Sequence, residues 1–139
     1  MSLDLIPASF HKIIQSRGYT TLILESNLTK FAIYTDAEVG KNIQIYLAHG
    51  KKPRPSSHEL IQSIFQGYKI HPLQIVIQDM EDSIYFARIF LEMRLDDKRT
   101  VLEIDARPSD CITLALLFNT PMFCRKELIE KVKAEHFNI

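Results

Sequence analysis

Apolar and polar residues alternate along much of this chain, and the spacing of the alternation changes from segment to segment. Runs of β-branched and aromatic residues with a period of two, bounded by short polar turns, are typical of β-strands. Five segments show this pattern, and the first two lie close enough to form a hairpin: 19–26, 30–35, 72–80, 83–94 and 100–106. A further short strand is expected in PMFCR, residues 121–125.

Other segments carry apolar residues at intervals of three and four, which predicts amphipathic helices. One helix is expected to begin after a capping Asp36 and to end near Gly50. In SSHELIQSIFQG, Ser56 and Glu59 fit a capping box, in which each side chain accepts a hydrogen bond from the other residue's backbone N–H. The apolar stripe expected on that helix comprises Leu60, Ile61, Ile64 and Phe65, and its polar side includes His58 and Gln62.

The remaining segments complete the predicted fold. PSDCITLALLFN, residues 108–119, is apolar on nearly all sides and is expected to be the central buried helix. Residues 126–137 predict a charged amphipathic helix, and residues 10–16 predict one or two helical turns. This order of strands and helices predicts an α+β fold, a single compact domain with a mixed β-sheet and flanking helices.

The balance of charge restricts what the chain recognises. Its 139 residues carry 17 Lys and Arg against 17 Asp and Glu, so attraction for a nucleic acid has to come from a local cluster of charge. Because no run of about 18 apolar residues occurs and the first residues lack a signal-peptide core, we expect no membrane partner and a cytoplasmic location. In that reducing compartment, Cys111 and Cys124 are expected to be free buried thiols rather than a disulfide.

The segment EIDARPSD holds the densest group of polar side chains. A period of two places Glu103, Asp105 and Arg107 on one face at the end of a strand, and Ser109 and Asp110 open the next helix. Carboxylates in such a place are candidate ligands for Mg or Mn, and an arginine beside helix N–H groups is a candidate phosphate site. The structural alternative is that Asp110 opposes the helix dipole while Arg107 pairs with Asp105.

A second polar cluster precedes the helix that follows Ser56. Lys51, Lys52 and Arg54 lie in a basic loop, and His58 follows in the first helical turn. Histidine exchanges protons near neutral pH, so His58 is a candidate general base or metal ligand. The alternative is a solvated basic loop with a histidine at the surface or in a cap.

Three blocks of this sequence together resemble the bifunctional nuclease domain family: RPSSHEL, SIYFARIFLE, and IDARPSDCITLAL with the later PMF. The resemblance covers about residues 19–132 and divides the chain into an N-terminal segment 1–18, a nuclease-like domain 19–132 and a helix end or tail 133–139. The positions that match the family motifs are Arg54, Pro55, His58, Glu59, Leu60, Asp105, Arg107, Pro108, Ser109 and Asp110, and also Glu38 if one residue is inserted. The resemblance implies a compact α+β domain, self-association into a homo-oligomer, and cleavage of RNA and DNA without sequence specificity.

The sequence departs from the family pattern at several motif positions. Thr35 stands where glycine is usual and Val39 where alanine is usual. Ser57 replaces a threonine, Cys111 replaces an alanine, and Leu117 stands where an arginine often follows. The loss of that arginine removes a candidate phosphate contact.

Two functional hypotheses follow from the motifs and the resemblance. The first is a nuclease of low sequence selectivity that acts on RNA and DNA, with the cofactor left open between none and a divalent cation. Its assigned residues are Asp105, Asp110, His58 and Glu38 as catalytic groups, Arg54, Arg107 and Ser109 as phosphate ligands, and Asp105 and Asp110 as candidate metal ligands. The second is a non-catalytic oligomeric module that binds a nucleic acid, a protein or an anion, in which the same residues form a structural ion-pair network. The hypotheses differ in whether the two Arg-Pro-Ser corners line one open cleft.

Overall fold

Seven strands and four helices follow one another in residues 4–137, the part of the chain that the computed structural model describes. The strands are β1 (Leu5–Ser16), β2 (Tyr19–Ser26), β3 (Thr29–Asp36), β4 (Ile70–Glu81), β5 (Ile84–Leu95), β6 (Lys98–Ala106) and β7 (Met122–Arg125). The helices are α1 (Ala37–Leu47), α2 (Ser57–Gly67), α3 (Pro108–Phe118) and α4 (Lys126–Phe137).

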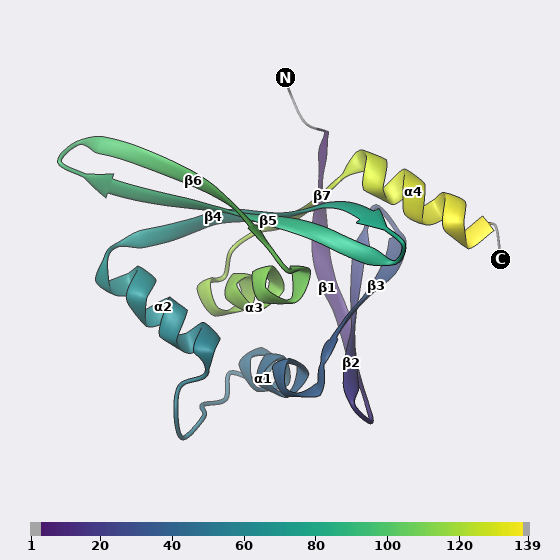
Figure 1. Cartoon of the computed structure of the whole chain (residues 1–139), viewed down its shortest axis with the longest axis horizontal. Coiled ribbons are helices and arrows are strands. Elements are labelled where there is room, and N and C mark those ends of the chain that lie inside the picture. The colour runs from purple at the N-terminus through teal and green to yellow at the C-terminus, as the bar shows by residue number, and fades with distance from the viewer. Residues whose placement is uncertain (1–3, 138–139) are drawn as a thin grey trace.

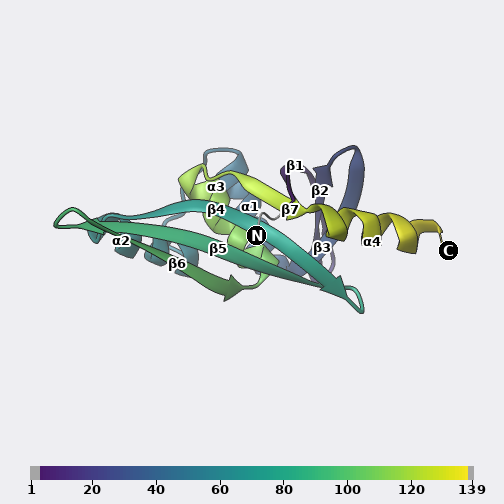
Figure 2. The ribbon, with the colours of Figure 1, turned by 90° about the horizontal axis from the view of Figure 1, so that it is seen from above.

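All of these strands join in one sheet, in the order β3-β2-β1-β7-β4-β5-β6. Neighbouring strands are antiparallel except for β4 and β7, which run parallel. The mixed sheet and the α+β class are therefore confirmed. The strands β4, β5 and β6 form a long twisted layer (Figure 2), and α1, α2 and α3 lie together on one side of it (Figure 1).

The prediction of helical turns over residues 10–16 is wrong, because this segment belongs to β1, which pairs with β2 and β7. A β-bulge just after Phe10 moves the inward-facing positions from even to odd numbers, so Ala8 and Phe10 pack on the core before the bulge and Ile13 packs on it afterwards. The resulting interval of three between Phe10 and Ile13 imitates a helical period. Backbone pairing of residues 10–16 with β2 decides the conformation instead.

Helix α1 packs directly on β2 at one glycine. Asp36 caps the helix as predicted, because its Oδ1 accepts a hydrogen bond of 2.8 Å from the backbone N–H of Val39. One turn later, a Cβ on Gly40 would lie 1.8 Å from Oγ1 of the fully buried Thr20. Only glycine lets α1 approach the sheet this closely.

Helix α3 is the central buried helix that its apolar sequence predicts. Residues 111–115 of this helix are all buried, and it packs on α1, α2, β4 and β5. The prediction for α2 is only half right: Ile61 and Phe65 pack on the core, while Leu60 and Ile64 are 58% and 46% exposed. His58 was expected on the polar side of α2 but is buried, with 8% exposure, because the first turn of α2 faces the start of α3.

Both cysteines are free and lie inside the protein. Burial raises the pKa of the Cys111 and Cys124 thiols to about 12. Within residues 4–137, none of the helices combines the length and the apolar character that crossing a membrane requires.

Candidate active site

A cleft of about 1070 Å³ lies between the helices and the end of the sheet. Its walls come from α1, the loop between α1 and α2, helix α2 as far as Phe65, the strands β5 and β6, and the first two turns of α3. The charged and ionisable residues that line it are Asp36, Glu38, Lys52, Arg54, His58, Arg107 and Asp110.

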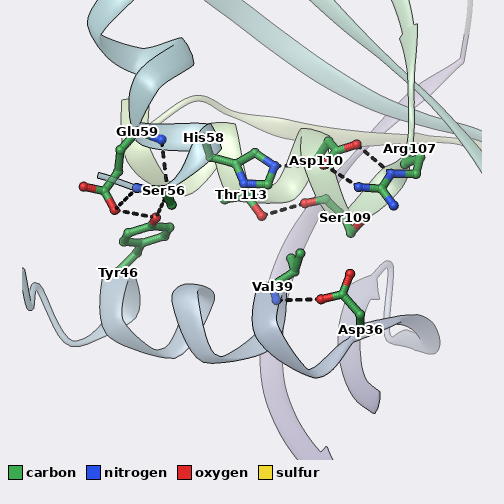
Figure 3. Close-up of polar contacts among 10 residues, drawn as sticks. All are labelled: Asp36, Val39, Tyr46, Ser56, His58, Glu59, Arg107, Ser109, Asp110 and Thr113. Atoms are coloured by element: carbon green, nitrogen blue, oxygen red, sulfur yellow. Dashed lines mark hydrogen bonds and ion pairs between the residues drawn. The ribbon is translucent and has the colours of Figure 1, made fainter. Parts of the chain in front are cut away.

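The two Arg-Pro-Ser corners meet in this cleft. Nε2 of His58, in the first turn of α2, lies 2.8 Å from Oδ1 of Asp110, in the first turn of α3 (Figure 3). These residues are 52 positions apart in the sequence. The contact joins the two helix starts and places His58 and Asp110 in the same cleft wall.

Asp110 is held from its other side by Arg107. The guanidinium donates from Nε to Oδ2 at 2.8 Å and from a terminal nitrogen to Oδ1 at 3.1 Å. The predicted pairing of Arg107 with Asp105 is therefore wrong. β6 ends at Ala106 and Arg107 is the N-cap of α3, so the backbone turns between the two residues and Arg107 faces Asp110 three positions later.

The surroundings of Asp110 fix its charge. The hydrogen bond with His58, followed by the contacts with Arg107, holds the pKa of the Asp110 carboxyl well below its usual range although partial burial opposes this. The same carboxylate raises the pKa of Arg107 through its hydrogen bonds and its charge.

An ionised carboxylate accepts hydrogen bonds only, so Nε2 of His58 carries the hydrogen in this pair. Nδ1 is then the nitrogen that can accept a proton. No partner for Nδ1 is found among the described residues, and the His58 side chain is 10% exposed. Because His58 lines the cleft, Nδ1 is the candidate proton acceptor for a molecule bound there.

The start of α2 is closed by its own side chains. The capping box is confirmed: the backbone N–H of Glu59 donates to Oγ of Ser56 at 3.2 Å, and Oε1 of Glu59 accepts from the backbone N–H of Ser56 at 3.4 Å. The hydroxyl of Tyr46 in α1 also donates to Oε1 of Glu59, at 2.8 Å. Desolvation raises the pKa of Glu59, but hydrogen bonds from Tyr46 and Ser56 outweigh it and lower the pKa overall.

The basic loop before α2 supplies two cations to the cleft. Nζ of Lys52 donates to Oδ1 of Asn42 in α1 at 2.6 Å, which ties the loop to that helix. Arg54 is exposed at the cleft wall, and within residues 4–137 its side chain has neither an ion pair nor a hydrogen bond. Among the described residues, neither Lys52 nor Arg54 forms an ion pair with a carboxylate, so both charges are available to a ligand.

The other predicted site residues are placed differently. Glu38 lines the cleft in the first turn of α1. Asp105 is exposed and opposite Arg88 on the neighbouring strand, and it does not line the cleft. Ser109 is buried with 5% exposure, and its backbone carbonyl accepts a hydrogen bond from Thr113 at 2.7 Å. The structure therefore brings together His58, Asp110, Arg107, Arg54 and Glu38, but not Asp105 or Ser109.

A metal ion held by protein ligands alone does not fit this arrangement. Among the residues that the structure describes, no group of three His, Cys, Asp or Glu side chains is close enough to share one ion. The candidate pair is separated, because Asp110 lies in the cleft and Asp105 lies outside it. Both oxygens of Asp110 are already occupied by His58 and Arg107.

Sequence reasoning missed two polar residues of α1 that support the site. Asn42 is buried and binds Lys52, and Tyr46 reaches Glu59 and Ser56. Both lie on the inward face of α1, so a polar side chain at a position with apolar spacing was the available signal. Their partners lie 10 to 13 residues farther along, across a loop whose path the pattern does not give.

The comparison with curated proteins gives no match to this chain. A family model described as bifunctional nuclease domain matches residues 22–136, and this match includes both Arg-Pro-Ser corners and every residue of the His58, Asp110 and Arg107 cluster. The chain therefore belongs to the bifunctional nuclease domain family.

Proposed function

We propose that this protein hydrolyses phosphodiester bonds in RNA and DNA with little sequence selectivity, in the cleft between α2 and α3. The observation that carries the proposal is the chain of contacts from Arg107 through Asp110 to His58 in the wall of the cleft. It presents an oriented imidazole beside cations. Attack on a phosphodiester needs both, a base for the nucleophile and positive charge for the phosphate. The family to which the chain belongs supports a nuclease-related function.

The chemistry can be assigned to this chain's own residues. An enzyme that cleaves both RNA and DNA cannot depend on the 2′-hydroxyl, so water is the nucleophile. Nδ1 of His58 takes the proton of that water as its oxygen forms a bond to phosphorus. The bond from phosphorus to the leaving oxygen breaks, solvent protonates that oxygen to the alcohol, and His58 afterwards returns its proton to solvent. Asp110 positions His58 and stabilises the imidazolium that forms.

The cations of the cleft have the second role. Arg54 and Lys52 bind the phosphate, and Arg107 adds positive charge near the start of α3. Glu38 is available to position the water from the opposite wall. Asp105 has no role in this mechanism, because it does not line the cleft.

The test compares variants of His58, Asp105 and Arg54 on labelled single-stranded RNA and on DNA. Each substrate is incubated with EDTA, with Mg and with Mn, so that a metal requirement is read directly. We expect His58→Gln to lose at least about 100-fold in cleavage rate, the usual contribution of a general base. Asp105→Asn serves as the matched carboxylate control and should stay within about twofold of wild type, since a surface carboxylate outside the site contributes little. Equal cleavage by His58→Gln and wild type, or no cleavage of any substrate, overturns the proposal.

One observation favours a second function, a non-catalytic binding module. His58 is buried, and its contact with Asp110 fastens α2 to α3 whether or not chemistry takes place. In this case wild type binds a labelled oligonucleotide without cleaving it under any metal condition. We also propose a cytoplasmic location and self-association, which cell fractionation and light scattering of the purified protein would test.

A further inference from the structure

The floor of the cleft is apolar, although phosphodiester hydrolysis requires no apolar surface. Eight apolar side chains from α1, α2, α3, β5 and β6 line the cleft: Val39, Ile61, Phe65, Ile89, Leu91, Ile104, Ala106 and Leu114. Phe65 is the aromatic residue among them, and it is supported from behind by Phe118 at a ring-centroid distance of 5.8 Å. The site already described uses none of these side chains.

Charged and apolar groups occupy different parts of the same cleft. The cations come from the loop before α2, with Lys52 and the exposed Arg54, and from the start of α3, with the exposed Arg107. The apolar residues Phe65, Ile89 and others line the side formed by α2 and the sheet. A ligand that fits both parts has an anionic group joined to a flat apolar body.

We propose that the cleft takes an unpaired nucleotide, with its base against the apolar floor and its phosphate at Lys52 and Arg54, so that the site acts on single strands rather than on continuous duplex. This inference rests on the proposed function and specifies its substrate. The cleft volume of about 1070 Å³ suits a short stretch of single strand, since pockets for small molecules range from about 300 to 1,000 Å³.

A duplex cannot use this floor without being opened. Paired bases are stacked on each other and show only their edges in the grooves, whereas a hydrophobic floor contacts the face of a base. A single strand offers such faces freely, and aromatic or apolar side chains stack on them in proteins that bind single strands. Duplex has to unpair and unstack a nucleotide first, which lowers its apparent affinity.

The same floor accounts for low sequence selectivity. Reading the identity of a base requires hydrogen-bond donors and acceptors at its edge. None of the eight floor side chains carries such a group. Stacking on hydrocarbon and on the ring of Phe65 tolerates all four bases.

The experiment measures binding separately from cleavage. Fluorescence anisotropy in EDTA, at about 50 mM salt because phosphate contacts weaken with salt, follows four labelled probes: a single-stranded DNA, the RNA of the same sequence, the blunt DNA duplex, and that duplex with an unpaired internal loop. We expect the single strands and the looped duplex to bind at least tenfold more tightly than the blunt duplex. Cleavage of the same four probes is measured in parallel.

Two variants change the floor and one variant is the control. Phe65→Leu removes the ring, and Ala106→Leu narrows the cleft without removing any internal contact. Phe86→Leu is the control: it makes the same phenylalanine-to-leucine substitution in β5, at a residue that is 43% exposed and does not line the cleft. We expect at least a fivefold loss of single-strand affinity in Phe65→Leu and Ala106→Leu and less than twofold in Phe86→Leu, each checked for folding by circular dichroism.

The outcomes separate this inference from the proposed function. Blunt duplex bound or cleaved as well as single strand, or Ala106→Leu binding single strand like wild type, overturns the inference and leaves the proposed nuclease intact. Single strands bound preferentially but never cleaved overturn the proposed hydrolysis and support the nucleotide site. Failure to bind any of the probes overturns the inference as well.

Discussion

Replacing Asp110 by asparagine removes the charge that links α2 to α3. The carboxylate accepts one hydrogen bond from His58 and two from Arg107, all between 2.8 and 3.1 Å. An asparagine can still accept from His58 through its oxygen, but its NH₂ group then faces the guanidinium, which is also a donor. We therefore expect a neutral hydrogen bond in place of the charged one to His58, and loss of the pair with Arg107.

The magnitude follows from the exposure of the two partners. The His58 side chain is 10% exposed, and replacing a charged hydrogen bond of about 1.5–3 kcal/mol by a neutral one of about 0.5–1.5 kcal/mol costs about 1–1.5 kcal/mol. The Arg107 side chain is 67% exposed, so its ion pair contributes only about 0.2–1 kcal/mol. Together Asp110→Asn should lower the free energy of unfolding by about 1–2.5 kcal/mol, or Tm by roughly 3–9 °C for a chain of this size.

Urea denaturation at pH 7 measures this loss, and Asp79→Asn is the matched control. Asp79 pairs with Lys131 at 3.1 Å, and both side chains are more than 40% exposed, so its replacement should cost less than about 1 kcal/mol. If Asp110→Asn destabilises the protein no more than Asp79→Asn does, the network does not hold the two helices. The reasoning about Asp110 is then refuted.

The cost of Asp110→Asn should also depend on pH. The pKa of Asp110 is lowered in the folded protein, so the unfolded chain binds the proton more readily. The stability that this carboxylate contributes is present above its unfolded pKa of about 3.9 and is lost as the pH falls through the lower folded value. The difference between wild type and Asp110→Asn should therefore shrink between about pH 5 and pH 3. An equal difference at both pH values would contradict the assigned pKa direction.

Two further pairs of variants test the packing of helices α1 and α2. Gly40→Ala should destabilise the protein by about 1–3 kcal/mol in thermal melts, because its Cβ would lie 1.8 Å from Thr20 Oγ1. Gly67→Ala at the end of α2 has no atom within 4 Å and should stabilise by about 0.4–1 kcal/mol, so equal melts of the two variants would contradict the close approach. Ser56→Ala removes the cap of α2 and should cost about 1 kcal/mol, whereas exposed Ser57→Ala should change stability by less than about 0.5 kcal/mol in the same urea assay; equal losses would show that the cap is not used.

The fold was predictable wherever a local pattern had one interpretation. The hairpin of β2 and β3, the capped helices and the buried α3 all follow from period and cap residues within a few positions of each other. β1 was missed because its bulge after Phe10 breaks the alternation that identifies a strand. Both sides of the bulge pair with β2, and residues Leu5 to Ala8 pair with the distant β7, contacts that no window of the sequence around Phe10 contains.

The site was predictable in its residue types but not in its contacts. The motifs single out His58, Asp110 and Arg107, which do share the cleft. The same reasoning included Asp105, because it assumed that the odd-numbered side chains of this strand face the site, whereas Ile104 and Ala106 line the cleft and Asp105 lies on the opposite face. Which face of a strand turns toward the cleft depends on packing against elements that are distant in the sequence.

The two Arg-Pro-Ser sequences occupy different registers of their helices, and this difference explains their different chemistry. In the second, Arg107 is itself the N-cap, so the acid at the third helical position, Asp110, lies within reach of its guanidinium. In the first, the serine is the N-cap, and Arg54 precedes the helix by two more residues while the third-position acid, Glu59, turns back to close the cap. One arginine is therefore committed to orienting Asp110 and, through it, His58. The other is left exposed at the cleft wall with its charge available for a phosphate. This division supports a site in which Arg107 orients Asp110 and Arg54 binds the phosphate. Arg54→Ala should therefore weaken substrate affinity with little change in Tm, and Arg107→Ala should lower both the affinity and Tm.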